Sequence, residues 1–163
     1  MLVFNLYFFT DGRYATIFIL MHSILKTNPM KEIINSNGKT EKLKCSIKEC
    51  QNTFIFCCVT VEQLEAHFDK LSRGMTQIQP FIALIGKSCT HPETIMVYLN
   101  GINYKFSSFL KAIDICFKAF QIFNMKYPTA GQIVWEFIQL HFFKEISIDI
   151  IHPSIKSLQK DLA

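Results

Sequence analysis

The sequence predicts an α+β fold, in which a small antiparallel or mixed sheet packs against two main C-terminal helices. Three observations predict it: an apolar run that ends in glycine, an Asn-Gly pair between two apolar runs, and two helical apolar stripes. The length of 163 residues fits one domain of roughly 100–200 residues. With 50% hydrophobic and 18% charged residues, the chain is not a disordered one. We expect the α+β domain to cover 53–163. An apolar lead and a basic linker cover 1–52, and the sequence does not indicate whether these residues are well ordered.

The sheet is best defined in the second half of the chain. Residues 80–86 form a continuous apolar run that ends at Gly86, as in a strand buried on both faces. Asn100 and Gly101 separate two further apolar runs. Both positions of such a two-residue turn need positive φ, which suits Asn-Gly, so we expect a hairpin over 94–106.

A further strand and a helix precede this hairpin. Residues 53–61 are strand-like, and the next helix starts at Thr60, where a hydroxyl lies three residues before Gln63 as in a capping box. Gly74 is the expected residue just beyond the end of this helix.

The C-terminal helices follow from apolar stripes at helical spacing. The stripes predict helices over 108–124 and 129–144, and residues 148–151 are expected to be extended. Pro153 suits the first turn of a last short helix through Leu162.

The N-terminal region is less clearly patterned. Residues 1–25 are predicted to form an apolar hairpin around a turn at Asp11 and Gly12, with a helix over 14–25 as the alternative. The apolar run in this region is too short for a membrane-spanning helix, which needs about 20 residues. Residues 26–52 are polar and basic and are predicted to be a linker or long loop.

The charge balance indicates no dedicated nucleic-acid surface. The net charge is +4, and the whole chain holds only two arginines, Arg13 and Arg73. Six lysines gather in 26–50: Lys26, Lys31, Lys39, Lys42, Lys44 and Lys48. We interpret them as a solvated linker, and nucleic-acid binding by these lysines is the alternative.

The cysteines of residues 26–50 raise a second alternative, a zinc site. Cys45 and Cys50 have a spacing that suits half of a zinc finger, and His67 follows. No His or Cys stands three to five residues after His67, so the pattern of a finger is incomplete. Unliganded thiols are the preferred interpretation.

The other cysteines indicate no catalytic thiol. Since no signal peptide is seen, we expect an intracellular protein, cytoplasmic or nuclear, with reduced and mostly buried thiols. Cys89 is the one cysteine near a basic residue in a loop, with His91 two positions on. A bond between the adjacent Cys57 and Cys58 is rare and is not expected.

No set of polar residues predicts an enzyme. Asp114 lies on a predicted helix, where Lys111 or Lys118 is close enough to form an ion pair with it. Gly86 and Lys87 follow a strand, but the earlier glycine of a phosphate-binding loop is missing. We therefore expect no catalytic residue and no cofactor.

Aromatic residues are the remaining signal. The chain holds 16 Phe, five Tyr and one Trp, more than a small core needs. We expect Tyr127, Phe142 and Phe143 to include exposed side chains of an interaction surface, with burial in the core as the alternative.

The second half also resembles a known group. The segments that carry the resemblance are 78–82, the hairpin, 110–118, Tyr127-Pro128 and 134–139. Together they resemble the C-terminal region of uncharacterised animal proteins similar to sterile alpha motif domain-containing protein 3. The resemblance covers about 62–162 and implies that this chain is a fragment of a longer protein. It implies no activity and no site residue.

These observations predict a non-enzymatic protein-interaction or structural module with an unidentified protein partner. The alternative is a zinc- or nucleic-acid-binding module that uses Cys45, Cys50, His67 and the lysines of 26–50. The sequence does not indicate an oligomeric state.

Overall fold

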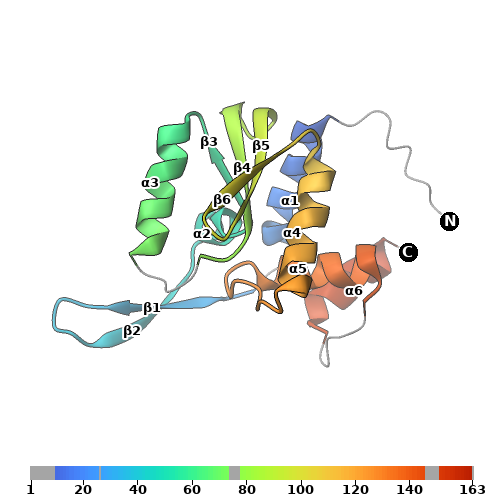
Figure 1. Cartoon of the computed structure of the whole chain (residues 1–163). Coiled ribbons are helices and arrows are strands. Elements are labelled where there is room, and N and C mark those ends of the chain that lie inside the picture. Colours follow the sequence, from blue (N-terminus) through green and yellow to red (C-terminus); the bar gives the residue numbers. More distant parts are fainter. Residues whose placement is uncertain (1–9, 26, 74–77, 146–150, 163) are drawn as a thin grey trace. The chain divides into compact units, whose positions relative to one another are not determined.

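The computed structural model forms two compact units (Figure 1). It describes the chain except for residues 1–9, 26, 74–77, 146–150 and 163. Unit 1 comprises Met1–Ile19 and Ile55–Met125, and unit 2 comprises Leu20–Phe54 and Lys126–Ala163. Each unit therefore combines segments from both sides of the boundary predicted at residue 52.

Unit 1 contains a four-stranded mixed sheet with the order β3-β4-β5-β6. Its strands are β3 (Ile55–Cys58), β4 (Phe81–Ser88), β5 (His91–Leu99) and β6 (Ile102–Phe106). β3 runs parallel to β4, and the other neighbours are antiparallel. The α+β class and the mixed sheet are thus confirmed.

The β5–β6 hairpin has the predicted turn. Leu99 lies opposite Ile102, and the two residues between them, Asn100 and Gly101, have φ of 49° and 84°. Gly86 does not end β4 as predicted. The strand continues through a register irregularity there, where a Cβ would lie 2.5 Å from the backbone oxygen of His91.

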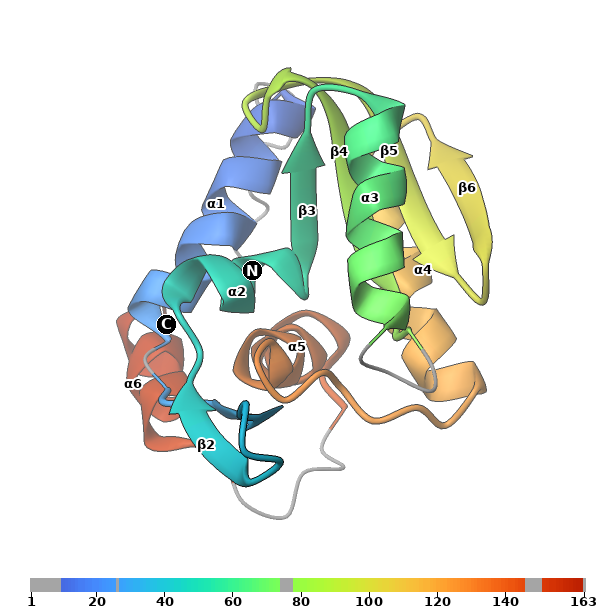
Figure 2. The same cartoon turned by 90° about the vertical axis from the view of Figure 1, so that its left-hand side faces the viewer.

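Helices lie on both faces of this sheet (Figures 1 and 2). On one face lies α3 (Val61–Ser72), and on the other lies α4 (Phe109–Ile122) together with the first part of α1 (Asp11–Ile24). The buried residues of the α3 side are Cys58, Leu64, Phe81, Ala83, Ile85, Met96 and Tyr98. Because side chains alternate along a strand, Ile82, Leu84, Ile95 and Val97 are buried on the α4 side.

The prediction of an N-terminal hairpin is wrong within the described residues. Asp11 and Gly12 do not form a turn but open α1, so the helical alternative was the better one. Gly12 packs so closely that a Cβ would lie 1.8 Å from the carbonyl oxygen of Thr90. The predicted first strand falls on residues 1–9, outside the described residues.

Unit 2 corrects the prediction of a linker over 26–52. This segment forms the antiparallel hairpin of β1 (Met30–Ile34) and β2 (Thr40–Lys44), followed by α2 (Ile47–Asn52). A capping box of Ser46 and Glu49 fixes the start of α2.

The C-terminal helices of unit 2 are α5 (Gln132–Ile138), the π-helix η2 (Gln139–Phe143) and α6 (Pro153–Asp161). α5 begins after Gly131 rather than at Thr129, and the helix ends at Lys144, whose φ is 58°. Pro153 stands at the first turn of α6 as predicted. Phe54 and Trp135 are fully buried in the core of this unit, with ring centroids 4.7 Å apart.

Candidate functional site

The three predicted interaction residues all lie in unit 2, in different environments. The hydroxyl of Tyr127 donates to Gln139 Oε1 at 2.8 Å, and its ring stacks on Trp135 with centroids 6.0 Å apart. Phe143 is half-buried, and Phe142 is 57% exposed. Only Phe142 therefore offers most of its ring to a partner.

Cys45 and Cys50 lie beside an ion pair in unit 2. Glu49 accepts hydrogen bonds from the ammonium of Lys31 and from Ser46, and these bonds lower the pKa of its carboxyl to about 2. Burial, followed by the negative charge of Glu49, raises the pKa of the Cys45 thiol. Burial also raises the pKa of Cys50. Both changes oppose the thiolate form that binds zinc.

His67 belongs to unit 1 and packs between aromatic rings. Its imidazole stacks on Phe56 with centroids 3.8 Å apart and meets Phe81 edge-on at 5.6 Å. Burial, helped by the charge of Lys70, lowers the pKa of His67. Among the described residues, no three His, Cys, Asp or Glu side chains are grouped as a metal would need.

The predicted basic segment is partly neutralised. Lys31 pairs with Glu49, and Lys42 lies 3.9 Å from the carboxylate of Glu32. Both pairs involve residues of the β1–β2 hairpin, so acidic and basic side chains are interspersed on it.

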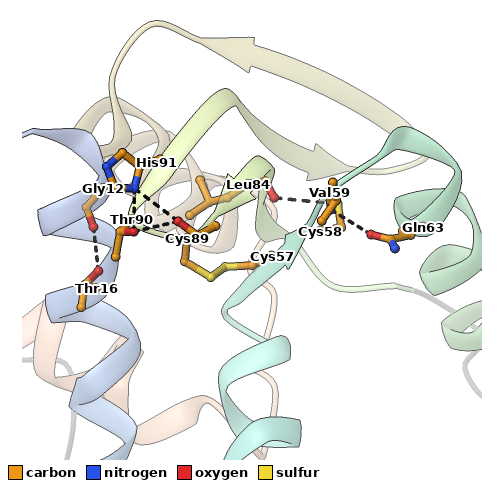
Figure 3. Close-up of a disulfide and its surroundings, with 11 residues drawn as sticks. Gly12, Thr16, Cys57, Cys58, Val59, Gln63, Leu84, Cys89, Thr90 and His91 are labelled. Atoms are coloured by element: carbon orange, nitrogen blue, oxygen red, sulfur yellow. Dashed lines mark hydrogen bonds between the residues drawn. A yellow bond between two sulfur atoms is a disulfide. The ribbon is translucent and has the colours of Figure 1, made fainter.

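A disulfide joins Cys57 on β3 to Cys89 in the β4–β5 turn (Figure 3), with a Cα–Cα distance of 5.7 Å. The prediction that all thiols are reduced is therefore wrong for this pair. The other four cysteines, Cys45, Cys50, Cys58 and Cys116, are free and buried. The disulfide was not predictable because its cysteines lie 32 positions apart and the sequence alone does not bring their strands together.

His91 and Asp114, the polar residues discussed in the sequence analysis, have local partners. His91 Nδ1 is hydrogen-bonded to Thr90 Oγ1 at 2.9 Å, next to the disulfide (Figure 3). Thr90 Oγ1 is also hydrogen-bonded to Ser88 Oγ at 2.7 Å. Asp114 accepts a hydrogen bond from Lys118 at 2.7 Å on α4, which confirms the predicted ion pair.

The β6 strand provides an open edge of the unit 1 sheet (Figure 2). In a hairpin with a two-residue turn, the residues next to the turn form a hydrogen-bonded pair, and such pairs then alternate along the ladder. Leu99 pairs with Ile102, so Asn103 and Lys105 occupy the non-hydrogen-bonded positions. Their backbone N–H and C=O groups point away from β5. These four groups have no hydrogen-bond partner among the described residues.

Apolar side chains accompany this edge. Ile102 is 54% exposed and Tyr104 is 44% exposed. They share one face of β6 with the half-buried Phe106, while Asn103 and Lys105 lie exposed on the other face. The sequence predicted the hairpin that contains these residues but did not single them out as a site, because the open edge depends on the order of the strands in the sheet.

The opposite edge of the sheet is less suited to pairing. β3 has only four residues. The side chain of Gln63 accepts a hydrogen bond at 2.8 Å from the backbone N–H of Val59, the residue that follows β3. The disulfide of Cys57 also constrains this strand. The open edge at β6 is thus the better candidate.

Comparison with known proteins assigns no function to the β6 edge, so its geometry alone carries the interpretation. No family model, curated protein or solved structure matches the chain. The resemblance to the sterile alpha motif domain-containing protein 3 group therefore stays a prediction. None of the helices in the described part of the chain combines the length and the apolar character that crossing a membrane requires.

Proposed function

We propose that the chain is a non-enzymatic protein-interaction module that binds an extended segment of a partner as an added strand next to β6. The observation that carries this proposal is the row of outward-facing backbone groups at Asn103 and Lys105. An added strand would satisfy these donors and acceptors, as in other proteins that bind peptides at a sheet edge.

The side chains of β6 support binding rather than protection of the edge. Natural proteins commonly blunt an open edge with charges, proline, bulges or very short strands. β6 has five residues, no proline and a single charged residue, Lys105. Its exposed Ile102 and Tyr104 would bury apolar surface against a neighbouring strand.

Local pairing of the polar candidates supports the non-enzymatic part of the proposal. Cys89 is held in the disulfide, and Asp114 is held by Lys118. A cysteine acts as a nucleophile only as a free thiolate, which a disulfide does not provide.

An intracellular location, cytoplasmic or nuclear, is the remaining part of the proposal. It is supported by four buried free thiols, which suit a reducing compartment. The Cys57–Cys89 disulfide would then be an exception to the reduced state of the other four cysteines.

Selection of random peptides displayed on phage against the purified chain tests the proposed binding mode. Enriched peptides should contain alternating apolar residues and should bind the Asn103→Ser variant as well as the wild type. They should lose binding to Asn103→Pro, which removes an outward-facing N–H without removing a hydrogen bond of the β5–β6 ladder. Equal binding of the enriched peptides to both variants contradicts strand addition at β6.

A further inference from the structure

We infer that the strand added to β6 is β6 of a second copy of this chain, paired antiparallel about a two-fold axis at Tyr104. This inference rests on the proposed function, since it names the partner of the same edge. The two four-stranded sheets would join into one continuous sheet through an isologous contact.

The backbone groups of β6 fit this arrangement. A two-fold axis at Tyr104 places Asn103 opposite Lys105 of the second copy, and Lys105 opposite its Asn103. Both residues have outward-facing N–H and C=O groups. Each opposed pair exchanges two hydrogen bonds in an antiparallel ladder, so the contact satisfies the outward groups of both strands together.

The side chains are complementary in the same register. On one face, Ile102 would lie opposite Phe106 of the second copy, and the two Tyr104 rings would lie opposite each other. Ile102 and Tyr104 are 54% and 44% exposed in the single chain, so both would gain burial. On the other face, the ammonium of Lys105 would lie opposite the amide of Asn103, which carries no charge to repel it.

Neighbouring two-fold registers are poorer. An axis at Lys105 would place two ammonium groups directly opposite each other, which destabilises a sheet. An axis at Asn103 would place Lys105 opposite Gly101, which lies in the turn with a φ of 84° and outside the strand. The sequence of β6 is therefore self-complementary about Tyr104.

Disulfide trapping tests this register. Tyr104 would face itself in a non-hydrogen-bonded pair, with a Cα–Cα distance of about 4.5 Å. We expect Tyr104→Cys to form a covalent dimer under mild oxidation. Ile102→Cys is the matched control on the same exposed face. Its two copies would lie about 13 Å apart at roughly 3.3 Å of rise per residue, so it should not cross-link.

Sedimentation velocity of the full chain over a wide concentration range tests the association itself. The wild type and Asn103→Ser should shift from monomer to dimer as concentration rises, and Asn103→Pro should stay monomeric. Circular dichroism shows whether Asn103→Pro is folded, and the trapping experiment does not depend on that variant.

Several results would overturn the inference. These are a wild type that stays monomeric at all concentrations, a dimer that Asn103→Pro leaves intact, and equal cross-linking through Ile102→Cys and Tyr104→Cys. If the chain stays monomeric while displayed peptides still bind in a proline-sensitive way, the proposed function stands and the partner is a different protein.

Discussion

The carboxylate of Asp11 accepts a hydrogen bond at 2.8 Å from the backbone N–H of Phe109, 98 residues further along the chain. Phe109 is the first residue of α4, and the N-cap residue Ser108 makes no capping hydrogen bond through its side chain. Asp11 therefore caps α4 from the start of α1. An anionic group at this position also interacts favourably with the helix dipole.

Replacing this cap should destabilise the chain. We expect Asp11→Ala to lower the free energy of unfolding by about 1 kcal/mol, since an N–H at the start of α4 loses its acceptor. Asp11→Asn should retain most of the stability, because its amide oxygen can accept the same bond. Urea unfolding of both variants measures the difference, and equal stability of Asp11→Ala and wild type would show that the cap contributes nothing.

The hairpin turn depends on the backbone of Gly101. We expect Gly101→Ala to cost about 1 kcal/mol, because an L-residue adopts the left-handed region reluctantly. No atom lies within 4 Å of a Cβ built at this position, so the cost comes from the backbone conformation alone. Asn100→Gly is the control and should be close to neutral, since glycine also adopts positive φ. Thermal unfolding compares the two, and a neutral Gly101→Ala would contradict this explanation.

The Cys57–Cys89 disulfide should stabilise unit 1. Its cysteines are 32 positions apart. In the loop-entropy model, closing a loop of this length raises the free energy of the unfolded chain by about 3–4 kcal/mol. Cys57→Ser should therefore unfold at lower urea concentration than the oxidised wild type. The reduced wild type should resemble Cys57→Ser. Mass spectrometry of the alkylated protein identifies the bond, and a pairing of Cys57 with any other cysteine would refute the assignment.

The Glu49 carboxyl should make the stability of unit 2 depend on acid pH. Its hydrogen bond from Lys31 lowers the folded pKa from the usual 4.5 to about 2. Between these two pKa values the Glu49 carboxyl binds a proton more readily in the unfolded chain than in the folded chain. The stability that the ion pair contributes is therefore present above about pH 4.5 and is lost as the pH falls toward 2. The effect is modest because the pair is exposed to solvent.

NMR titration of the Glu49 side chain measures this directly. We expect the midpoint well below that of ordinary glutamates, and we expect Lys31→Met to move it upward. Glu49→Gln should remove this part of the acid dependence of unfolding. An ordinary midpoint in the wild type would mean that the ion pair does not persist in solution.

The sequence predicted those parts of the fold that neighbouring residues determine. The turn at Asn100 and Gly101 and the start of α6 at Pro153 depend on neighbouring residues, and both are confirmed. The ion pair of Asp114 and Lys118 is likewise set by helical spacing.

The sequence was less informative for elements whose position depends on distant residues and for strands that have no buried face. Apolar residues lie all around α1, with Ile17 exposed and Phe18 buried, so periodicity could not distinguish a helix from a strand. The strands of the β1–β2 hairpin are largely exposed and show no apolar alternation. The open edge at β6 follows from strand order, which no local pattern specifies.

Unit 1 is discontinuous in sequence, and this has a consequence for biosynthesis. The α1 residues that pack in it, such as Phe18 against Phe109, leave the ribosome long before β4, β5 and α4 exist. At roughly 5–20 residues per second, this delay is on the order of 5–20 s. During that time the apolar side chains of the nascent α1 segment remain exposed to solvent. A holding chaperone that recognises short apolar stretches would therefore meet this chain early in translation.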